Sequence, residues 1–106
     1  MDSDTFNAIV SEQQERSAEV LISKAREYAT DDRLHNFRVA AELSEVSLRQ
    51  ALAGMMAKHT VSIYDMCKSS DEHSIASWNE KITDHINYLL LLRAVVEEER
   101  ILKARE

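Results

Sequence analysis

The chain contains no proline and a single glycine, Gly54, in 106 residues. These two residue types most often interrupt or end helices, so their near absence favours long, uninterrupted helices. Ala, Leu, Glu, Arg and Lys, all good helix formers, dominate the remaining composition. The sequence therefore predicts an all-α fold, and a chain of this length favours one domain.

Apolar residues at helical spacing predict four helices with short connections, which is a four-helix bundle-like architecture. Residues 30–32 and 69–71 are rich in Ser, Thr and Asp and predict turns, and Ser44 or Ser47 is expected to cap the third helix. We expect the helices at about residues 4–29, 33–43, 48–68 and 74–103. The second and third helices could also form one bent helix.

The first helix is expected to begin after Ser3 or Asp4, which are good caps. Its apolar stripe is predicted to pack inward, and Gln13 and Ser17 interrupt this stripe with polar groups. The stripe consists of Phe6, Ile9, Val10, Val20, Leu21, Ala25 and Tyr28. In the fourth helix, the residues expected to face packing partners are Ile75, Trp78, Ile82, Ile86, Leu89, Leu90, Val95 and Val96.

Residues 88–92 form an apolar run that covers a helix on all sides, which is typical of a helix enclosed by neighbours. A chain of this size buries only a modest part of its surface alone. We therefore expect a homo-oligomer, either a dimer or a tetramer, with part of the core at the subunit interface. The core is expected at about residues 4–96, and the charged residues 97–106 are expected to form a tail that projects or frays.

The net charge of −6 argues against binding to a nucleic-acid duplex, since backbone binding relies on clustered Lys and Arg. Free nucleotides remain possible, because a metal ion can bridge acidic side chains and phosphates. The single cysteine, Cys67, cannot form an internal disulfide, which suits a reducing cytosol. The acidic first residues lack a signal-peptide core, and no apolar run is long enough to span a bilayer. We expect a cytoplasmic protein that does not bind membranes.

Glu80, Asp84 and Asn87 form a column of oxygen-bearing side chains, because positions i, i+4 and i+7 share one helix face. Four consecutive leucines, residues 89–92, follow within a turn, so the column is predicted to lead into a buried core. Burying an unpaired charge is costly. A hard divalent cation with a phosphate substrate would account for carboxylates in such a place.

Three short segments, in order along the chain, carry a family resemblance. They are Lys24-Ala25-Arg26-Glu27-Tyr28 followed by Asn36-Phe37, then Lys58 with Ser62-Ile63, and Asp84-His85-Ile86-Asn87-Tyr88 preceded by Glu80. These segments resemble the nucleotide-modification-associated domain of phages and bacteria. That family belongs near the all-α nucleoside triphosphate pyrophosphohydrolases, the MazG-like group.

The resemblance implies an oligomeric helical protein of phage origin, in the host cytoplasm, with a Mg²⁺-dependent site for a nucleoside triphosphate. It implies catalytic and metal-binding roles for Glu80 and Asp84, with Glu27 and Glu45 as further metal ligands. Lys58, Asn87 and Asn36 would contact the substrate, with Lys58 meeting a phosphate as a point charge. The implied chemistry is attack of a metal-activated water on a phosphoryl group.

The sequence departs from the better-known pyrophosphohydrolases, which carry Glu-x-x-Glu on one helix and Glu-x-x-Asp on the next. Glu42 and Glu45 supply the first motif, but Glu80 and Asp84 are one residue too far apart for the second. A non-catalytic, oligomeric helical interaction protein is therefore the alternative function.

Each candidate residue also has a structural interpretation. Glu80 and Asp84 could lie on a solvated helix face, and Asn87 could be a buried amide that fixes helix register. Lys58 could extend along its own stem to the surface. His59 is expected to be a core or interface histidine, because the spacing of the four histidines supports no zinc site.

Overall fold

The computed structural model describes residues 1–27 and 30–106, in which four α-helices and no strand are present. The helices are α1 Ser3–Ala25, α2 His35–Ser44, α3 Leu48–Lys68 and α4 Ile75–Ala104. The prediction of an all-α fold with four helices is confirmed. The bounds expected for α3 and α4 agree with the structure to within a residue or two.

The first helix differs from its prediction at both ends. Asp2, rather than Ser3 or Asp4, is the N-cap, and its side chain accepts a hydrogen bond from the backbone N–H of Thr5 at 2.7 Å. The helix ends at Ala25, whereas the apolar stripe predicted an end near residue 29. Residues 28 and 29, including the Tyr28 that was assigned to the stripe, lie outside the described part of the chain.

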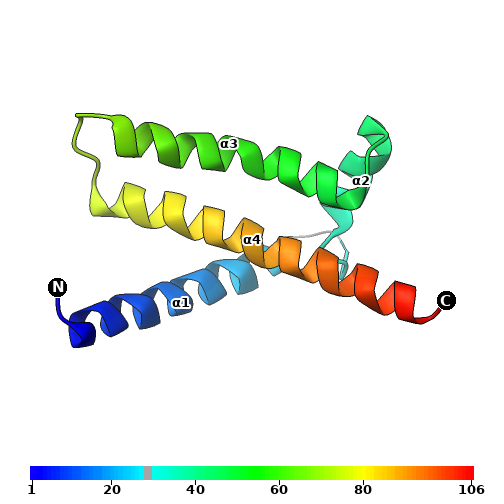
Figure 1. The fold of residues 1–106 in the computed structure, drawn as a ribbon, viewed down its shortest axis with the longest axis horizontal. Helices are drawn as coiled ribbons and strands as arrows, with labels where there is room; N and C mark the ends of the chain where they lie inside the picture. Colours follow the sequence, from blue (N-terminus) through cyan, green and yellow to red (C-terminus); the bar gives the residue numbers. More distant parts are fainter. Residues whose placement is uncertain (28–29) are drawn as a thin grey trace.

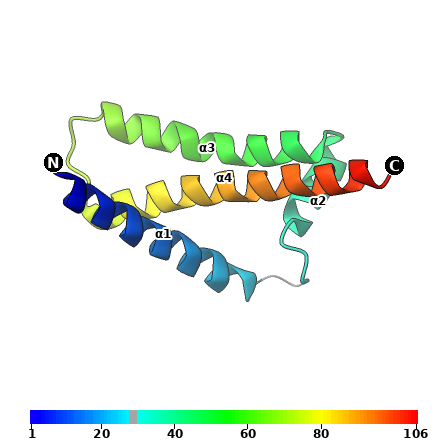
Figure 2. The same cartoon turned by 60° about the horizontal axis from the view of Figure 1, so that its bottom comes forward.

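The three long helices lie side by side, with α4 between α3 and α1 in both views (Figures 1 and 2). α3 runs antiparallel to α4 and is joined to it by residues 69–74, whereas α1 runs in the same direction as α4 (Figure 1). The short α2 packs against α3. Between described residues, α1 contacts α4 and neither of the other two helices. The result is an open bundle in which α4 is the central element.

Serine caps fix the starts of α3 and α4. The Ser47 hydroxyl accepts from the backbone N–H of Gln50, and the Gln50 side chain accepts from the N–H of Ser47 at 2.9 Å, which is a capping box. Ser74 accepts from the N–H of Ser77 at 3.1 Å in the same way. Of the two caps considered for the third helix, Ser47 is the one used.

A left-handed residue separates α2 from α3. Glu45 has φ 55° and ψ 44°, and the N–H of Val46 donates to the carbonyl oxygen of Ala41 at 3.0 Å. The N–H of Glu45 donates to the carbonyl of Glu42 at 3.3 Å. This hydrogen-bond pattern is a Schellman motif, which ends a helix and reverses the chain. The alternative of one bent helix is therefore wrong.

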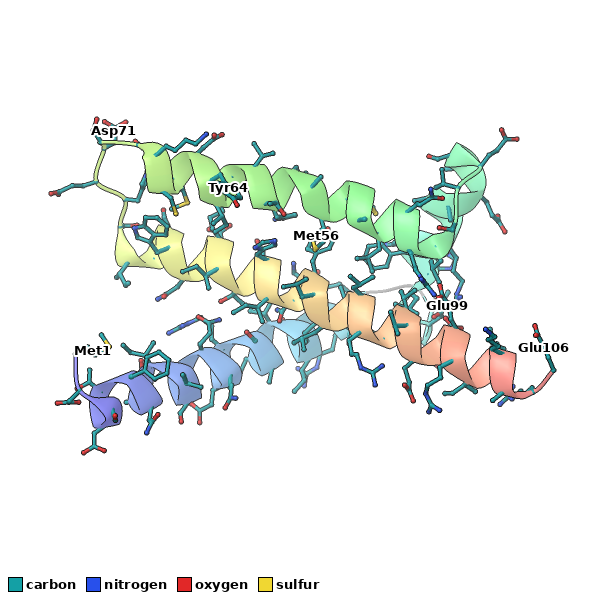
Figure 3. The ribbon with its side chains drawn as sticks, in the orientation of Figure 1. Met1, Met56, Tyr64, Asp71, Glu99 and Glu106 are labelled. Carbon is teal, nitrogen blue, oxygen red and sulfur yellow. The ribbon has the colours of Figure 1, made fainter. Side chains whose placement is uncertain are left out.

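The apolar core is small and lies where α2, α3 and the second half of α4 meet. Leu34, Phe37, Leu52 and Val95 form its buried centre, and Leu52 and Val95 are fully enclosed. Partly buried side chains surround this centre: Leu48, Met55, Tyr88, Leu91 and Leu92. Met56 extends from α3 toward α4 along the same interface (Figure 3). Helical spacing predicts Leu34, Phe37, Ala40 and Ala41 as the inward positions of the second helix; Leu34, Phe37 and Ala41 are buried, and Ala40 is half-buried.

Ion pairs hold the C-terminal part of α4 against α2 and α3. Arg38 Nη2 lies 2.7 Å from Glu98 Oε1, and Arg49 pairs with Glu99, which is labelled in Figure 3. Arg38 also binds Asp32 at 2.6 Å, and this hydrogen bond lowers the pKa of the Asp32 carboxyl. Such partly exposed pairs contribute little stability individually. α4 continues to Ala104, so most of the segment that was expected to project or fray is helical.

Only part of the apolar stripe of α1 packs inward as predicted: Val20, Leu21 and Ala25 are half-buried, whereas the first turns of the stripe are exposed. Phe6, Ile9 and Val10 are 56%, 46% and 37% exposed, and Ser17 is the only buried residue of this helix. Ile75 and Leu89 of α4 are likewise exposed. The reason is geometric, because α1 packs against one neighbour instead of the two or three that a closed bundle provides. No helix of the described residues is long and apolar enough to cross a membrane.

Candidate functional site

Two pairs of polar side chains meet where α1 crosses α4, and we call them the polar layer: Gln13 and Ser17 on α1, Thr83 and Asn87 on α4. Gln13 Nε2 donates to Ser17 Oγ at 3.1 Å and to Thr83 Oγ1 at 2.9 Å. Asn87 Nδ2 donates to the backbone oxygen of Ser17 at 3.3 Å. Ser17, Thr83 and Asn87 are 4%, 2% and 6% exposed. Sliding α1 along α4 would break these bonds, so the polar layer fixes the register of the two helices.

Asn87 has one further property that bears on ligand binding. Its Oδ1 atom is buried and accepts no hydrogen bond from any described residue. A buried acceptor without a donor costs free energy, and a water or a ligand donor would remove that cost. Its Nδ2 contact agrees with the register role that the sequence suggested, whereas substrate contact stays a prediction.

A small cavity of about 60 Å³ lies beside Asn87 and faces both Lys24 and Asp84. Lys24 Nζ lies 4.0 Å from Asp84 Oδ1, with the two side chains 55% and 22% exposed. Phe37 and Tyr88 close the cavity from the core side. A space of this size is large enough for a few water molecules and far smaller than the roughly 300–1,000 Å³ of a typical ligand pocket.

Glu80 and Asp84 share one face of α4, as predicted, and border a shallow depression of about 360 Å³. Two cations, Arg16 and Lys24 of α1, border the same depression. Among the described residues that line this depression, Glu80 and Asp84 have positive charge beside them and no third carboxylate. Glu80 is exposed to solvent.

Glu27 and Glu45, the other two predicted metal ligands, are exposed and line neither hollow that contains Asp84. Glu27 follows the end of α1, and Glu45 follows the end of α2. Within residues 1–27 and 30–106, no three His, Cys, Asp or Glu side chains are grouped to hold a metal ion. The structure does not bring the four predicted ligands together, and their metal roles stay predictions.

The predicted substrate residues Lys58 and Asn36 lie on α3 and α2, and both are exposed. Neither lines the cavity or the depression that contains Asp84. Of the substrate residues that the resemblance implied, Asn87 alone borders a hollow shared with Asp84.

His59 lies at the interface of α3 and α4, as expected. Its ring is 4.6 Å from the ring of Tyr88, which in turn meets Phe37 edge-on at 6.1 Å. Burial lowers the pKa of His59, and the nearby Asp84 carboxylate opposes that effect. His85 Nε2 on α4 lies 2.9 Å from Thr60 Oγ1 on α3. Both histidines thus contact the neighbouring helix across the α3–α4 interface.

A third hollow, the α1–α4 groove, has a volume of about 570 Å³ and an apolar lining. None of the residues that line it is charged. They are Ile9, Val10, Gln13, Gln14, Ser17, Ala18, Leu21, Ile86 and Leu90. An uncharged groove between two helices suits an apolar side of another helix and offers nothing to a phosphate.

Sequence reasoning missed Thr83 and the pairing of Lys24 with Asp84. The signal for Thr83 was its position four residues before Asn87, matching the Gln13 and Ser17 spacing on α1. No local pattern identifies the ion pair between Lys24 and Asp84, because its partners are far apart in the sequence.

Comparisons with family models, with curated proteins and with solved structures found no match to this chain.

Proposed function

We propose that this chain is a non-catalytic helical interaction module that self-associates. The observation that carries the proposal is the large solvent-exposed surface area of the chain. The chain exposes 7935 Å², whereas a compact monomer of its 12.1 kDa mass exposes roughly 6,000 Å². The surplus of about 1,900 Å² lies in the range that one subunit of an obligate dimer buries.

The shape of the chain supports the same proposal. Its radius of gyration is 16.3 Å, compared with about 13 Å for a compact domain of this length. The extents of 49, 29 and 25 Å describe an elongated molecule. An elongated chain with a small core leaves apolar side chains without neighbours, and association is the ordinary way to cover them.

The chemistry of the exposed apolar side chains favours a protein partner. The α1–α4 groove has no charged lining residue, although the chain as a whole carries a net charge of −6. An uncharged contact surface lets acidic chains approach without bringing like charges together.

Thermal unfolding at several chain concentrations tests this function. An oligomer that dissociates on unfolding gains stability by mass action, so its Tm rises with concentration. We expect a rise of several degrees over a roughly hundredfold range of concentration, followed by circular dichroism. A Tm that stays constant over this range would count against self-association.

Mg²⁺-dependent nucleotide binding, of the kind found in (d)NTP pyrophosphohydrolases, is the second candidate. The unpartnered Asn87 Oδ1 supports it, since this atom borders the cavity that also contains Asp84 and Lys24. Mg²⁺ retains several waters and needs few protein ligands, so Glu80 and Asp84 would suffice to hold it.

Thermal shift with Mg²⁺ and each nucleoside triphosphate separates the two functions. The interaction module predicts no change in Tm, whereas a nucleotide site in the folded state must raise it. If a nucleotide raises the Tm, Asp84→Ala and Glu80→Ala should abolish both the shift and pyrophosphate release. Glu12→Ala, an exposed carboxylate on α1, is the matched control and should leave both unchanged.

A further inference from the structure

Four apolar residues of α4 repeat at intervals of seven. Ile75, Ile82, Leu89 and Val96 are 74%, 38%, 50% and 41% exposed, and we call them the α4 seam. Seven residues are close to two helical turns, so the α4 seam runs along one side of the helix. Apolar residues repeating in this way are typical of a helix that packs lengthwise against another helix. All four side chains keep more than a third of their surface exposed in the described part of the chain.

The α4 seam is continuous with the α1–α4 groove. Ile86 follows Ile82 by four residues and lines the groove together with Leu90. The groove adds Val10 and Leu21 of α1 to the same apolar surface. One uncovered surface therefore spans the two helices, and the core among α2, α3 and α4 lies elsewhere.

We propose that a second copy of this chain covers this surface, with the two α4 helices antiparallel across a two-fold axis. The proposal rests on the self-association proposed above and names its surface and geometry. Two observations favour a second copy as the occupant. The surplus surface of about 1,900 Å² matches what a dimer subunit buries, and an uncharged patch is complementary to itself.

The charges beside the α4 seam favour the antiparallel arrangement. Arg93 and Arg100 follow Leu89 and Val96 by four residues each and so flank the α4 seam. A parallel pair would bring each arginine next to the same arginine of the second copy. Within one chain, Glu97 binds Arg93 at 3.0 Å and Arg100 at 2.5 Å, and its single negative charge offsets only one of their two positive charges.

An antiparallel pair instead places Asp71 and Glu72, which precede α4, near Arg100 and Lys103 in the last turns of the second copy's α4. The three glutamates at that end, Glu97, Glu98 and Glu99, are each already paired with an arginine of their own chain. Alignment of the α4 seam on its own copy brings these two ends together. The helix dipoles also oppose each other in this arrangement.

Sedimentation of charged variants tests the surface. Leu89→Glu and Ile82→Glu would place a carboxylate in the subunit contact and are expected to weaken association more than about tenfold. Both side chains are already exposed within one chain, so the helices should still form. Val61→Glu is the matched control, because Val61 is a 57% exposed residue of α3, outside the proposed contact, and should associate like the unmodified chain.

Disulfide cross-linking tests the orientation and does not depend on the charged variants folding. In a Cys67→Ser background, Ile75→Cys and Val96→Cys place one thiol at each end of the α4 seam. These positions lie about 32 Å apart along the helix, and a disulfide requires Cα atoms within about 7 Å. A mixture of the two variants is expected to cross-link on oxidation, and neither variant alone is expected to do so.

The outcomes separate the geometry from the self-association. Efficient cross-linking of each single variant with itself would establish a parallel pair and overturn the arrangement. An oligomer that survives both charged substitutions and yields no cross-link would overturn the surface but leave self-association intact. A monomeric unmodified chain would assign the surface to a partner of different sequence and would overturn both proposals.

Discussion

At the scale of single residues, backbone conformation at Glu45 matters more than its carboxylate. The family resemblance suggested a metal ligand, but the side chain is exposed and the residue is left-handed, with φ 55°. Residues with a Cβ atom pay about 1–2 kcal/mol in this conformation, and glycine does not. The position is the C′ residue of the Schellman motif that ends α2, where glycine is the usual choice.

Glu45→Gly is therefore expected to stabilise the chain by about 0.5–1 kcal/mol, after the added flexibility of the unfolded chain is subtracted. Urea unfolding measures the change. Glu42→Gly is the matched control three residues earlier, inside α2, where the same substitution should destabilise by about 0.5–1 kcal/mol. Destabilisation by Glu45→Gly would show that the carboxylate contributes something that the structure does not explain.

At the scale of helices, the sequence predicted where most elements begin and end, because caps act locally. Ser47 and Ser74 could be identified from a few neighbouring residues, and both cap their helices. The sequence could not predict which sides of the helices are covered. The stripes of α1 and α4 have the spacing of buried surfaces, but spacing does not specify whether the covering helix belongs to the same chain.

The attachment of α1 to α4 is largely polar, which makes it sensitive to single hydroxyl groups. Thr83→Val removes the oxygen that accepts from Gln13 Nε2 and preserves the side-chain shape. We expect a loss of about 1 kcal/mol in unfolding free energy, since an intramolecular hydrogen bond of this kind contributes that much. A double-mutant cycle with Gln13→Ala should show coupling between the two sites. Additive effects would mean that the polar layer does not hold α1.

At the scale of the whole molecule, the candidate site was predicted only in part. Glu80 and Asp84 share a face of α4, and Asn87 is buried, as their spacing indicated. The convergence of Glu27 and Glu45 on that face was expected from the resemblance and is not seen in the structure. The tertiary fold decides such convergence, because these residues follow helix ends whose directions the sequence pattern leaves open.

The small size of the buried core gives the exposed apolar surface of the molecule a functional interpretation. A buried core centred on Leu52 and Val95 is small for a chain that orders four helices. Conformational entropy opposes that ordering at every residue, and apolar burial is the main compensation. The α1–α4 groove and the α4 seam are the surfaces where association would bury more.

The native mass of the unmodified chain, measured by sedimentation equilibrium at micromolar concentration, tests this account most directly. We predict a mass of at least twice the 12.1 kDa of one chain, accompanied by the full helical signal. A folded species that sediments at 12.1 kDa at every concentration would contradict it.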